Sequence, residues 1–427
     1  MKKLLIIQDS LENKISYYHL IAFLVALPFD RFYGEIILIS FLLHTLIHLN
    51  RPKLANAFTV QTLLAASVFI IALIGLVYSQ HRQDGLKNLE KQLAILLFPF
   101  LLAICGLDLK KYLTNFLLIF SFTCVLTVLY LYADALHLII YNKLPLSTLF
   151  TGAFINHNFS DPIGLHATYF AMYCGLSESI LFYLFLVETK RSSRLIYVLA
   201  LCILLAGLLQ LASRAVLISG VAVVLSFPFL LSKKTARTKV YFIMTGVLIF
   251  AGILIVNISS FKMRYVAQLK EDLTQQSINN EILEPRALRW EYIMKDIEKA
   301  PITGYGTGSG QTVLNQTYFD NKLYNSYLHH LNTHNQYLGI WLEQGAWGLL
   351  LFIFTLLAAI IAAFREKNIP FLSFLIIICI VSFSENILDA NKGIFFYSFF
   401  LSLFLLSGKP FDEVFRFRKG RDHLKPK

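Results

Sequence analysis

The feature that most constrains this chain is its series of long apolar runs. Residues 199–209 are apolar throughout and show no alternation of polar and apolar positions. Strands of a transmembrane barrel do alternate, so these runs indicate helices. Charged residues make up only 15% of the chain, against about 25% in soluble domains. The composition excludes a soluble enzyme and a disordered chain, and predicts an all-α polytopic membrane protein.

A membrane-spanning helix needs about 20 mostly apolar residues, which divides the chain into about twelve spans. Residues 1–257 are predicted to hold spans one to nine, and residues 336–427 hold spans ten to twelve with a basic tail. Residues 258–335 are predicted to form a large, partly helical loop between them. The spans are expected near residues 15–29, 34–48, 58–79, 93–107, 112–134, 162–186, 195–212, 215–231, 239–257, 336–362, 370–388 and 392–407.

The distribution of Lys and Arg sets the orientation, because short cytoplasmic loops are rich in both. With the N-terminus inside, the inner segments hold 23 of the 38 basic residues. Both termini are therefore predicted to be cytoplasmic, and the large loop periplasmic. Met1-Lys-Lys is read as a cytoplasmic start, because no small-residue cleavage site follows. The net charge of +12 is mainly an orientation signal, and nucleic acid is not a predicted partner.

The large loop contains an expected amphipathic helix that begins after Pro285. Trp290, Ile293 and Ile297 follow helical spacing, and Arg286 falls on the same face, with Arg289 at its edge. Two guanidiniums near a helix N-terminus suit phosphate oxygens. The alternative is snorkelling, or pairing with nearby carboxylates such as Glu284.

Two further motifs follow in this loop. Residues 304–310 read Gly-Tyr-Gly-Thr-Gly-Ser-Gly, either a flexible turn or a phosphate cradle, without the spacing of a nucleotide-binding loop. His330 and His334 stand one helical turn apart, but no third ligand completes a zinc motif, so no metal or cofactor is predicted. His334 lies at the membrane boundary, where a histidine suits general-base catalysis.

Polar residues also gather at the predicted outer ends of other spans. Arg214 lies in a short apolar hairpin and is expected to be a third anion contact, or else to snorkel. His166 and Tyr169 enter the sixth span and are candidates to line a sugar or lipid site, or to cap and pack it. Glu385 and Asp389, between the last two spans, are candidate bases or partners of the arginines.

Two other carboxylates are rival base candidates. Asp30 and Glu35 lie in the first outer loop, where membrane glycosyltransferases of one broad class keep an essential carboxylate. The sequence contains no Asp-x-Asp motif, which argues against a metal-chelating nucleotide-sugar site.

These residues resemble the O-antigen ligase and polymerase superfamily. Its motif is His, then Asn, Ser or Gln, nine residues, Gly, two residues, and Gly, Thr or Tyr. Here His334-Asn335, Gly345 and Gly348 match it in full. Arg214 falls where ligases keep an essential Arg, although the Leu often found four residues later is Ile218 here. The Arg-x10-Gly loops of some polymerases are missing, which favours a ligase.

The resemblance implies a metal-independent, inverting glycosyltransferase of the bacterial inner membrane. Its donor would be an undecaprenyl-diphosphate-linked glycan, and its acceptor a hydroxyl of lipid A–core or another glycan. Membrane lipid would surround the prenyl chain. His334 would be the catalytic base, while Arg214, Arg286 and Arg289 bind the diphosphate. His330 and Asn335 are further substrate-lining candidates.

Three other functions stay open on the sequence. A repeat-unit polymerase would use a second lipid-linked glycan as acceptor, and a protein O-oligosaccharyltransferase would use Ser or Thr. A twelve-span transporter belongs to a different class, and it is disfavoured because charged residues inside the spans are few, with Glu178 the main example.

Overall fold

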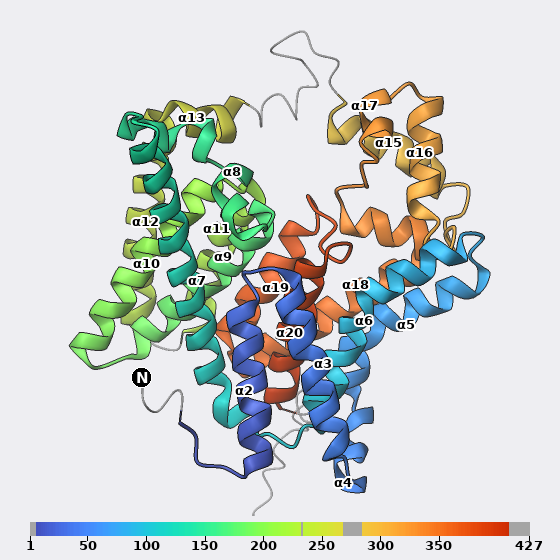
Figure 1. The fold of residues 1–427 in the computed structure, drawn as a ribbon, viewed down its shortest axis with the longest axis horizontal. Helices are drawn as coiled ribbons and strands as arrows, with labels where there is room; N and C mark the ends of the chain where they lie inside the picture. Colours follow the sequence, from blue (N-terminus) through green and yellow to red (C-terminus); the bar gives the residue numbers. More distant parts are fainter. Residues whose placement is uncertain (1–5, 232–233, 268–283, 410–427) are drawn as a thin grey trace, which may run out of the picture.

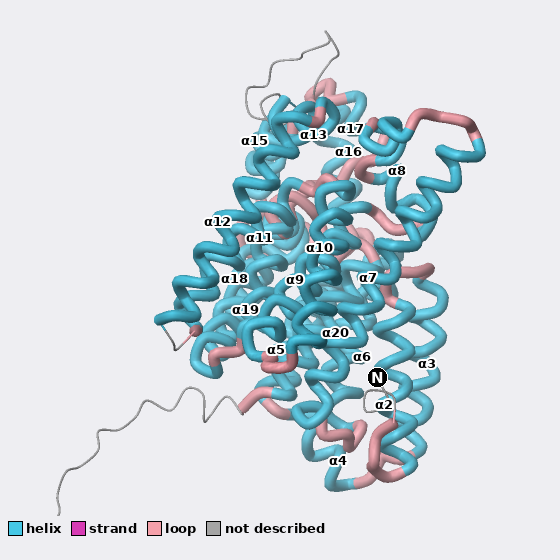
Figure 2. The backbone as a smooth tube through the Cα atoms, turned by 90° about the vertical axis from the view of Figure 1, so that its left-hand side faces the viewer, coloured by secondary structure: helices cyan, strands magenta, loops and turns pink. Residues whose placement is uncertain are grey.

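The computed structural model describes residues 6–231, 234–267 and 284–409 of the chain. Residues 268–283 of the large loop, and all of the basic tail except Lys409, lie outside this described part. Within these three ranges the regular structure is entirely helical (Figure 2). The all-α class is therefore confirmed for the described residues.

Each of the twelve predicted apolar runs coincides with a helix. Five of these are long and apolar enough to cross a membrane, or six if a bent pair at residues 31–58 counts as one span. The chain is thus a helical membrane protein, and the number twelve stays a prediction. The helices are α2 (Leu11–Ala26), α3 (Arg31–Ile47), α5 (Val60–Tyr78), α6 (Arg82–Ile104), α7 (Leu109–Tyr141), α9 (Ala167–Val187), α10 (Arg191–Leu211), α11 (Arg214–Leu230), α12 (Lys234–Asn257), α18 (Gln336–Glu366), α19 (Ile369–Val381) and α20 (Asn391–Ser407).

Shorter helices connect these elements. The described part of the large loop holds α13 (Ser259–Lys262), a π-helical turn η5 (Met263–Ala267), α15 (Arg286–Ile297), α16 (Gly310–Asp320) and α17 (Tyr324–Leu328). Elsewhere lie α4 (Arg51–Ala55), η1 (Asn56–Phe58), η2 (Leu146–Phe150), η3 (Gly152–Phe154), α8 (His157–Ser160) and η4 (Asp161–Ile163). The helix predicted after Pro285 is confirmed as α15.

Helix α20 forms the centre of the core. Its residues are apolar around the whole circumference, and such a helix is stable only when protein surrounds it. It packs against α5, α6, α7, α9 and α19. Phe396 and Phe400 are fully buried, and their rings contact Phe120 and Phe374. The last predicted span is therefore the best buried one.

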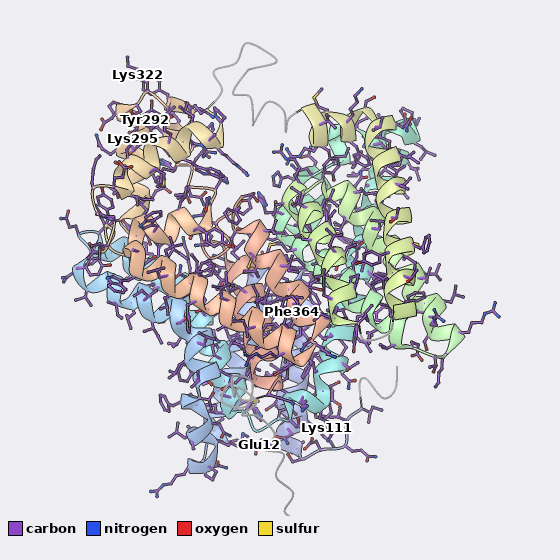
Figure 3. The ribbon with its side chains drawn as sticks, turned by 180° about the vertical axis from the view of Figure 1, so that it is seen from behind. Glu12, Lys111, Tyr292, Lys295, Lys322 and Phe364 are labelled. Carbon is purple, nitrogen blue, oxygen red and sulfur yellow. The ribbon has the colours of Figure 1, made fainter. Side chains whose placement is uncertain are left out.

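The helices of the large loop lie at one end of the molecule, and α4 lies at the other (Figure 1). Figure 3 shows Tyr292, Lys295 and Lys322 together at the first end, while Glu12 and Lys111 lie at the opposite end. These residues from predicted outer and inner segments thus lie at opposite ends of the molecule, while Phe364 lies between them (Figure 3). The site described below lies between α15–α17 and the core helices.

Two helix boundaries differ from the prediction. Helix α6 begins at Arg82, about three turns before the expected start near residue 93, because the preceding polar residues continue the helix outside the apolar run. Helix α19 ends at Val381 instead of near residue 388. There the chain leaves the helix and Leu388 donates its N–H to the side chain of Gln336, 2.7 Å away.

Candidate active site

The family motif forms the start of α18. Asn335 is the N-cap, and its Oδ1 accepts the N–H groups of Tyr337 (3.0 Å) and Leu338 (3.2 Å). Asn and Ser are favoured at this position because a short polar side chain satisfies the free N–H groups of the first turn. Asn335 is buried, so the structure assigns it a capping contact. His334 directly precedes the cap, with φ +45° in the left-handed region, and its N–H donates to Asn332 Oδ1 at 3.0 Å.

The glycine of the motif breaks α18 within its third turn. Gly345 has φ +66° and ψ −167°, a combination that is open only to glycine. A Cβ there would lie 2.2 Å from the carbonyl oxygen of Ile302. The break lets residues 301–306 dock on α18, where Ala346 donates to the carbonyl of Pro301 at 2.9 Å. The motif thus specifies a capped start and a break that seats the preceding loop.

The glycine-rich segment folds around a carboxylate of the protein. Gly304, Gly306 and Gly308 all have positive φ. The N–H groups of Gly308 and Gly310 donate to Oε1 of Glu343 on α18, at 3.3 and 3.1 Å. Amides that would otherwise cradle a phosphate therefore hold Glu343. Of the two interpretations, this contact favours the structural turn.

The loop between α19 and α20 is tied to the motif by Asn386. Its Oδ1 accepts from the N–H of Asn335 (2.8 Å) and from Thr333 Oγ1 (2.9 Å), and its Nδ2 donates to Asp389 (2.8 Å). Asn386 is only 5% exposed. A satisfied, buried polar network of this kind fixes one geometry. The segment around His334 is thereby held against the segment that carries Glu385.

Glu385 joins His334 to Arg286. One carboxylate oxygen lies 3.6 Å from His334 Nδ1, and the other lies 3.6 Å from an Nη atom of Arg286. The Glu385 side chain is 14% exposed, while His334 and Arg286 are 26% and 34% exposed. Burial alone raises the pKa of Glu385, but His334 and Arg286 outweigh it and leave the pKa below its ordinary value. Glu385 is therefore an anion at neutral pH, between a histidine and an arginine that solvent can reach.

Arg289 and Trp290 support this cluster from α15. Arg289 donates to the carbonyl of Asn332 at 3.4 Å, and Trp290 Nε1 donates to that of Thr333 at 2.8 Å. Arg289 is only 4% exposed, and desolvation lowers the pKa of its guanidinium. These contacts position the loop before His334. A direct phosphate contact by Arg289 stays a prediction.

His166 and Tyr169 reach the same loop from α9. Tyr169 is 9% exposed, and its hydroxyl donates to the carbonyl of Asn386 at 3.4 Å. The ring centroid of His166 lies 4.0 Å from that of His157. His166 is exposed at the surface, yet desolvation of its ring and the neighbouring His157 lower its pKa to about 4. His166 is thus a neutral side chain beside the cluster at physiological pH.

Arg214 begins α11 at the same end of the bundle and is partly buried. The preceding turn is held by Arg264, whose Nε donates to the carbonyl of Ala212 at 3.4 Å. Arg264 and His157 line a cavity of about 530 Å³. The role of Arg214 in binding diphosphate stays a prediction.

A larger cavity of about 710 Å³ has His334 in its wall, and neither Glu385 nor Arg286 lines it. His330, His334 and Asp389 contribute to its wall, together with α6, α16 and the first half of α18. His330 has its Nδ1 3.4 Å from Asn315 Oδ1. In the described ranges, no three His, Cys, Asp or Glu side chains gather closely enough to hold a metal ion.

The structure also separates the candidate carboxylates. Asp30 caps α3 through the N–H of Phe32 at 2.8 Å, and Glu35 accepts from Asn391 at 2.9 Å. Glu385 is the carboxylate that contacts His334, whereas Asp389 binds Asn386. Asn386 and the polar face of α6 were not predicted. The signal for the α6 face was present, as polar residues recur at helical spacing before the apolar run.

Comparison with known protein families gives a match of residues 199–353 to the family described as O-Antigen ligase. This region begins within α10 and ends within α18, so it includes Arg214, Arg286, Arg289 and His334, while Glu385 lies beyond it. The match confirms the resemblance to the O-antigen ligase superfamily. It implies a glycosyltransferase-like enzyme of a bacterial membrane, with a lipid-linked glycan donor and a glycan acceptor. No curated protein matches the chain.

Proposed function

We propose that this protein transfers a glycan from undecaprenyl diphosphate to a sugar hydroxyl of lipid A–core. The reaction takes place on the periplasmic face of the bacterial inner membrane, and both termini are cytoplasmic. The observation that carries the proposal is the contact of the motif histidine, His334, with Glu385, which in turn contacts Arg286. A base, its orienting carboxylate and an anion-binding group thus stand side by side.

Glu385 orients His334 for proton transfer. When Nδ1 carries the proton that faces the carboxylate, Nε2 keeps its lone pair and serves as the base. The acceptor hydroxyl gives its proton to Nε2 while its oxygen attacks the anomeric carbon. The bond from that carbon to the diphosphate oxygen breaks, and undecaprenyl diphosphate leaves with the electron pair. This single displacement inverts the anomeric configuration.

Arginine side chains stabilise the departing diphosphate. Arg286 is partly exposed, and its planar fork binds two phosphate oxygens at once. Arg214 provides a second contact, and Arg289 provides a third or holds the loop in place. Fixed positive charge near the leaving oxygen lowers the barrier as negative charge develops there. A Lys in place of Arg286 keeps the charge but loses the fork, so R286K should also transfer poorly.

The test uses the full chain in liposomes, with undecaprenyl-diphosphate-linked glycan as donor and rough lipopolysaccharide as acceptor. His334→Ala should lower transfer by about 100-fold or more, the usual contribution of a general base. His329→Ala is the matched control, because His329 is exposed and lies outside the cluster. Near-normal transfer by H334A would reject the base assignment. Elongation of the lipid-linked glycan without transfer to lipopolysaccharide would identify a polymerase instead.

A further inference from the structure

The outer extension of α6 presents a polar face to the 710 Å³ cavity. Asp84, Lys87, Asn88, Lys91 and Gln92 all line this cavity. Their spacing of three, four, seven and eight residues from Asp84 places them on one side of a helix. The face begins at Asp84, about half a turn after the helix starts at Arg82, and ends where the apolar run begins. These five polar side chains have no role in the mechanism above.

The chemistry of the cavity wall suits a sugar. Amide side chains come from several elements: Asn88, Gln92, Gln311, Asn315, Asn332 and Gln336. An amide carries both donors and an acceptor, as the hydroxyls of a saccharide require. The oxygens of Asn332 and Gln336 already accept from His334 and Leu388, so these two residues offer mainly their donors. The volume lies within the range of about 300–1,000 Å³ that is usual for ligand sites.

The charges of the wall do not suit a diphosphate. Lys87 pairs with Asp84 at 3.0 Å, and the carboxylate of Glu343 is held by backbone amides. Burial raises the pKa of Asp389, and Lys91 is among the neighbours that oppose the rise. Arg214, Arg286 and Arg289 do not line this cavity. The wall therefore has no surplus of positive charge, in contrast to the side of His334 that faces Arg286.

Gln92 adds an unused acceptor. Its Nε2 donates to the carbonyl of Leu388 at 3.2 Å, which orients the amide, while its Oε1 is buried and accepts no hydrogen bond from the described residues. Nearly all buried polar atoms in proteins are hydrogen-bonded, so such an oxygen points to a donor supplied from elsewhere. Gln92 is part of the cavity wall, so a ligand hydroxyl can supply this donor once the amide turns toward the cavity.

We infer that this cavity binds the acceptor saccharide, and that the polar face of α6 recognises its hydroxyl groups. The inference rests on the proposed function and gives it a geometry: His334 stands between an acceptor side, lined by α6, and a donor side at Arg286. Acceptor choice then depends on Asn88 and Gln92, which lie on an element outside the matched family region.

The test is an acceptor titration with the full chain in liposomes, with rough lipopolysaccharide as the varied acceptor. Asn88→Ala should raise the acceptor KM by about fivefold and the double variant N88A/Q92A by about 30-fold, since each lost hydrogen bond contributes roughly 1 kcal/mol. The donor KM and kcat should stay within about twofold. Gln83→Ala is the control, because Gln83 lies on α6 but outside the cavity wall. The double variant also loses the Gln92–Leu388 hydrogen bond, which could unfold the loop. The single variant N88A keeps that bond and therefore still tests the proposal.

The outcomes separate the two proposals. A raised donor KM, or no change in either KM, would overturn the inference while transfer itself continued. Loss of kcat with both KM values unchanged would also overturn it. If the wild-type chain only elongates lipid-linked glycan, the ligase proposal fails, and the same titration with that glycan as acceptor still tests the cavity.

Discussion

Replacing Asn386 by Ala should disable the site mainly by displacing His334, although Asn386 also lines the 710 Å³ cavity. The Asn386 side chain accepts from the N–H of Asn335 and from Thr333, and donates to Asp389. Alanine leaves the N–H of Asn335 and one oxygen of Asp389 without this partner in a buried setting. Each such group costs about 1–3 kcal/mol, so the free energy of unfolding should fall by about 2–6 kcal/mol.

The effect on catalysis follows from the position of the network. Asn335 directly follows His334, and Asn386 directly follows Glu385, so this network sets the distance between the two. A displacement of about 1 Å between catalytic groups lowers a rate by roughly 100-fold. N386A should therefore lower kcat by about this factor and leave the donor KM nearly unchanged, while the acceptor KM rises less than kcat falls, because Asn386 is one of many residues that line the cavity.

The assay is glycan transfer in liposomes, together with thermal unfolding in detergent. Asn386→Asp is the second variant to compare. It keeps the acceptor oxygens for Asn335 and Thr333 but places a second carboxylate next to Asp389. This variant should retain more activity than N386A. Its loss of activity relative to wild type should become smaller as the pH falls, because the two neighbouring carboxylates then share a proton. A stable N386A enzyme with normal kcat would refute the positioning argument.

Two further predictions concern the backbone break and the histidine pair. Gly345→Ala should lower the free energy of unfolding by about 2 kcal/mol or more, because the new Cβ would strike the carbonyl of Ile302. Gly152→Ala is the control, because a Cβ there would meet open space, and it should leave the free energy of unfolding unchanged. Thermal melts of the two variants test the prediction. The pKa of His166 is about 4 in the folded chain, against an ordinary value of 6.5. Between these two pH values the unfolded chain binds more protons than the folded chain, so the free energy of unfolding decreases as the pH falls from 6.5 to about 4. His166→Asn should flatten this fall in melts at pH 7 and pH 5 while leaving transfer above pH 5 with its original pH dependence; an unchanged slope would contradict the argument.

The elements that were predictable are those that a local pattern defines. Apolar runs predicted the twelve main helices, of which five or six are long and apolar enough to cross a membrane, since one stretch of chain must satisfy its own backbone groups in lipid. The helix after Pro285 followed from its amphipathic spacing. His334 and Asn335 were identified by the motif, and the structure adds the reason for the second position, which is a helix cap.

Two features of the site were missed for different reasons. The polar face of α6 could have been predicted, because polar residues recur there with helical spacing: Asp84, Lys87, Asn88, Lys91 and Gln92. A search for apolar spans alone places the start of this helix too late in the sequence. The network of Asn386 has no comparable signal. Its partners Thr333 and Asn335 lie more than 50 residues away in the sequence, and only the packing of the α19–α20 loop on α18 brings them together.

The choice among the acidic residues shows where pattern reasoning reaches its limit. Glu385 and Asp389 stand four residues apart in one loop, and sequence alone gives them the same candidate role. Their surroundings separate them: Glu385 is held as an anion by His334 and Arg286, whereas burial raises the pKa of Asp389, which faces Asn386. A carboxylate that stays ionised orients an imidazole base and stabilises the imidazolium that forms when the base takes up a proton. Of these two carboxylates, Glu385 suits this role. Its pKa lies below its ordinary value, so it stays ionised, and one of its oxygens faces the imidazole of His334.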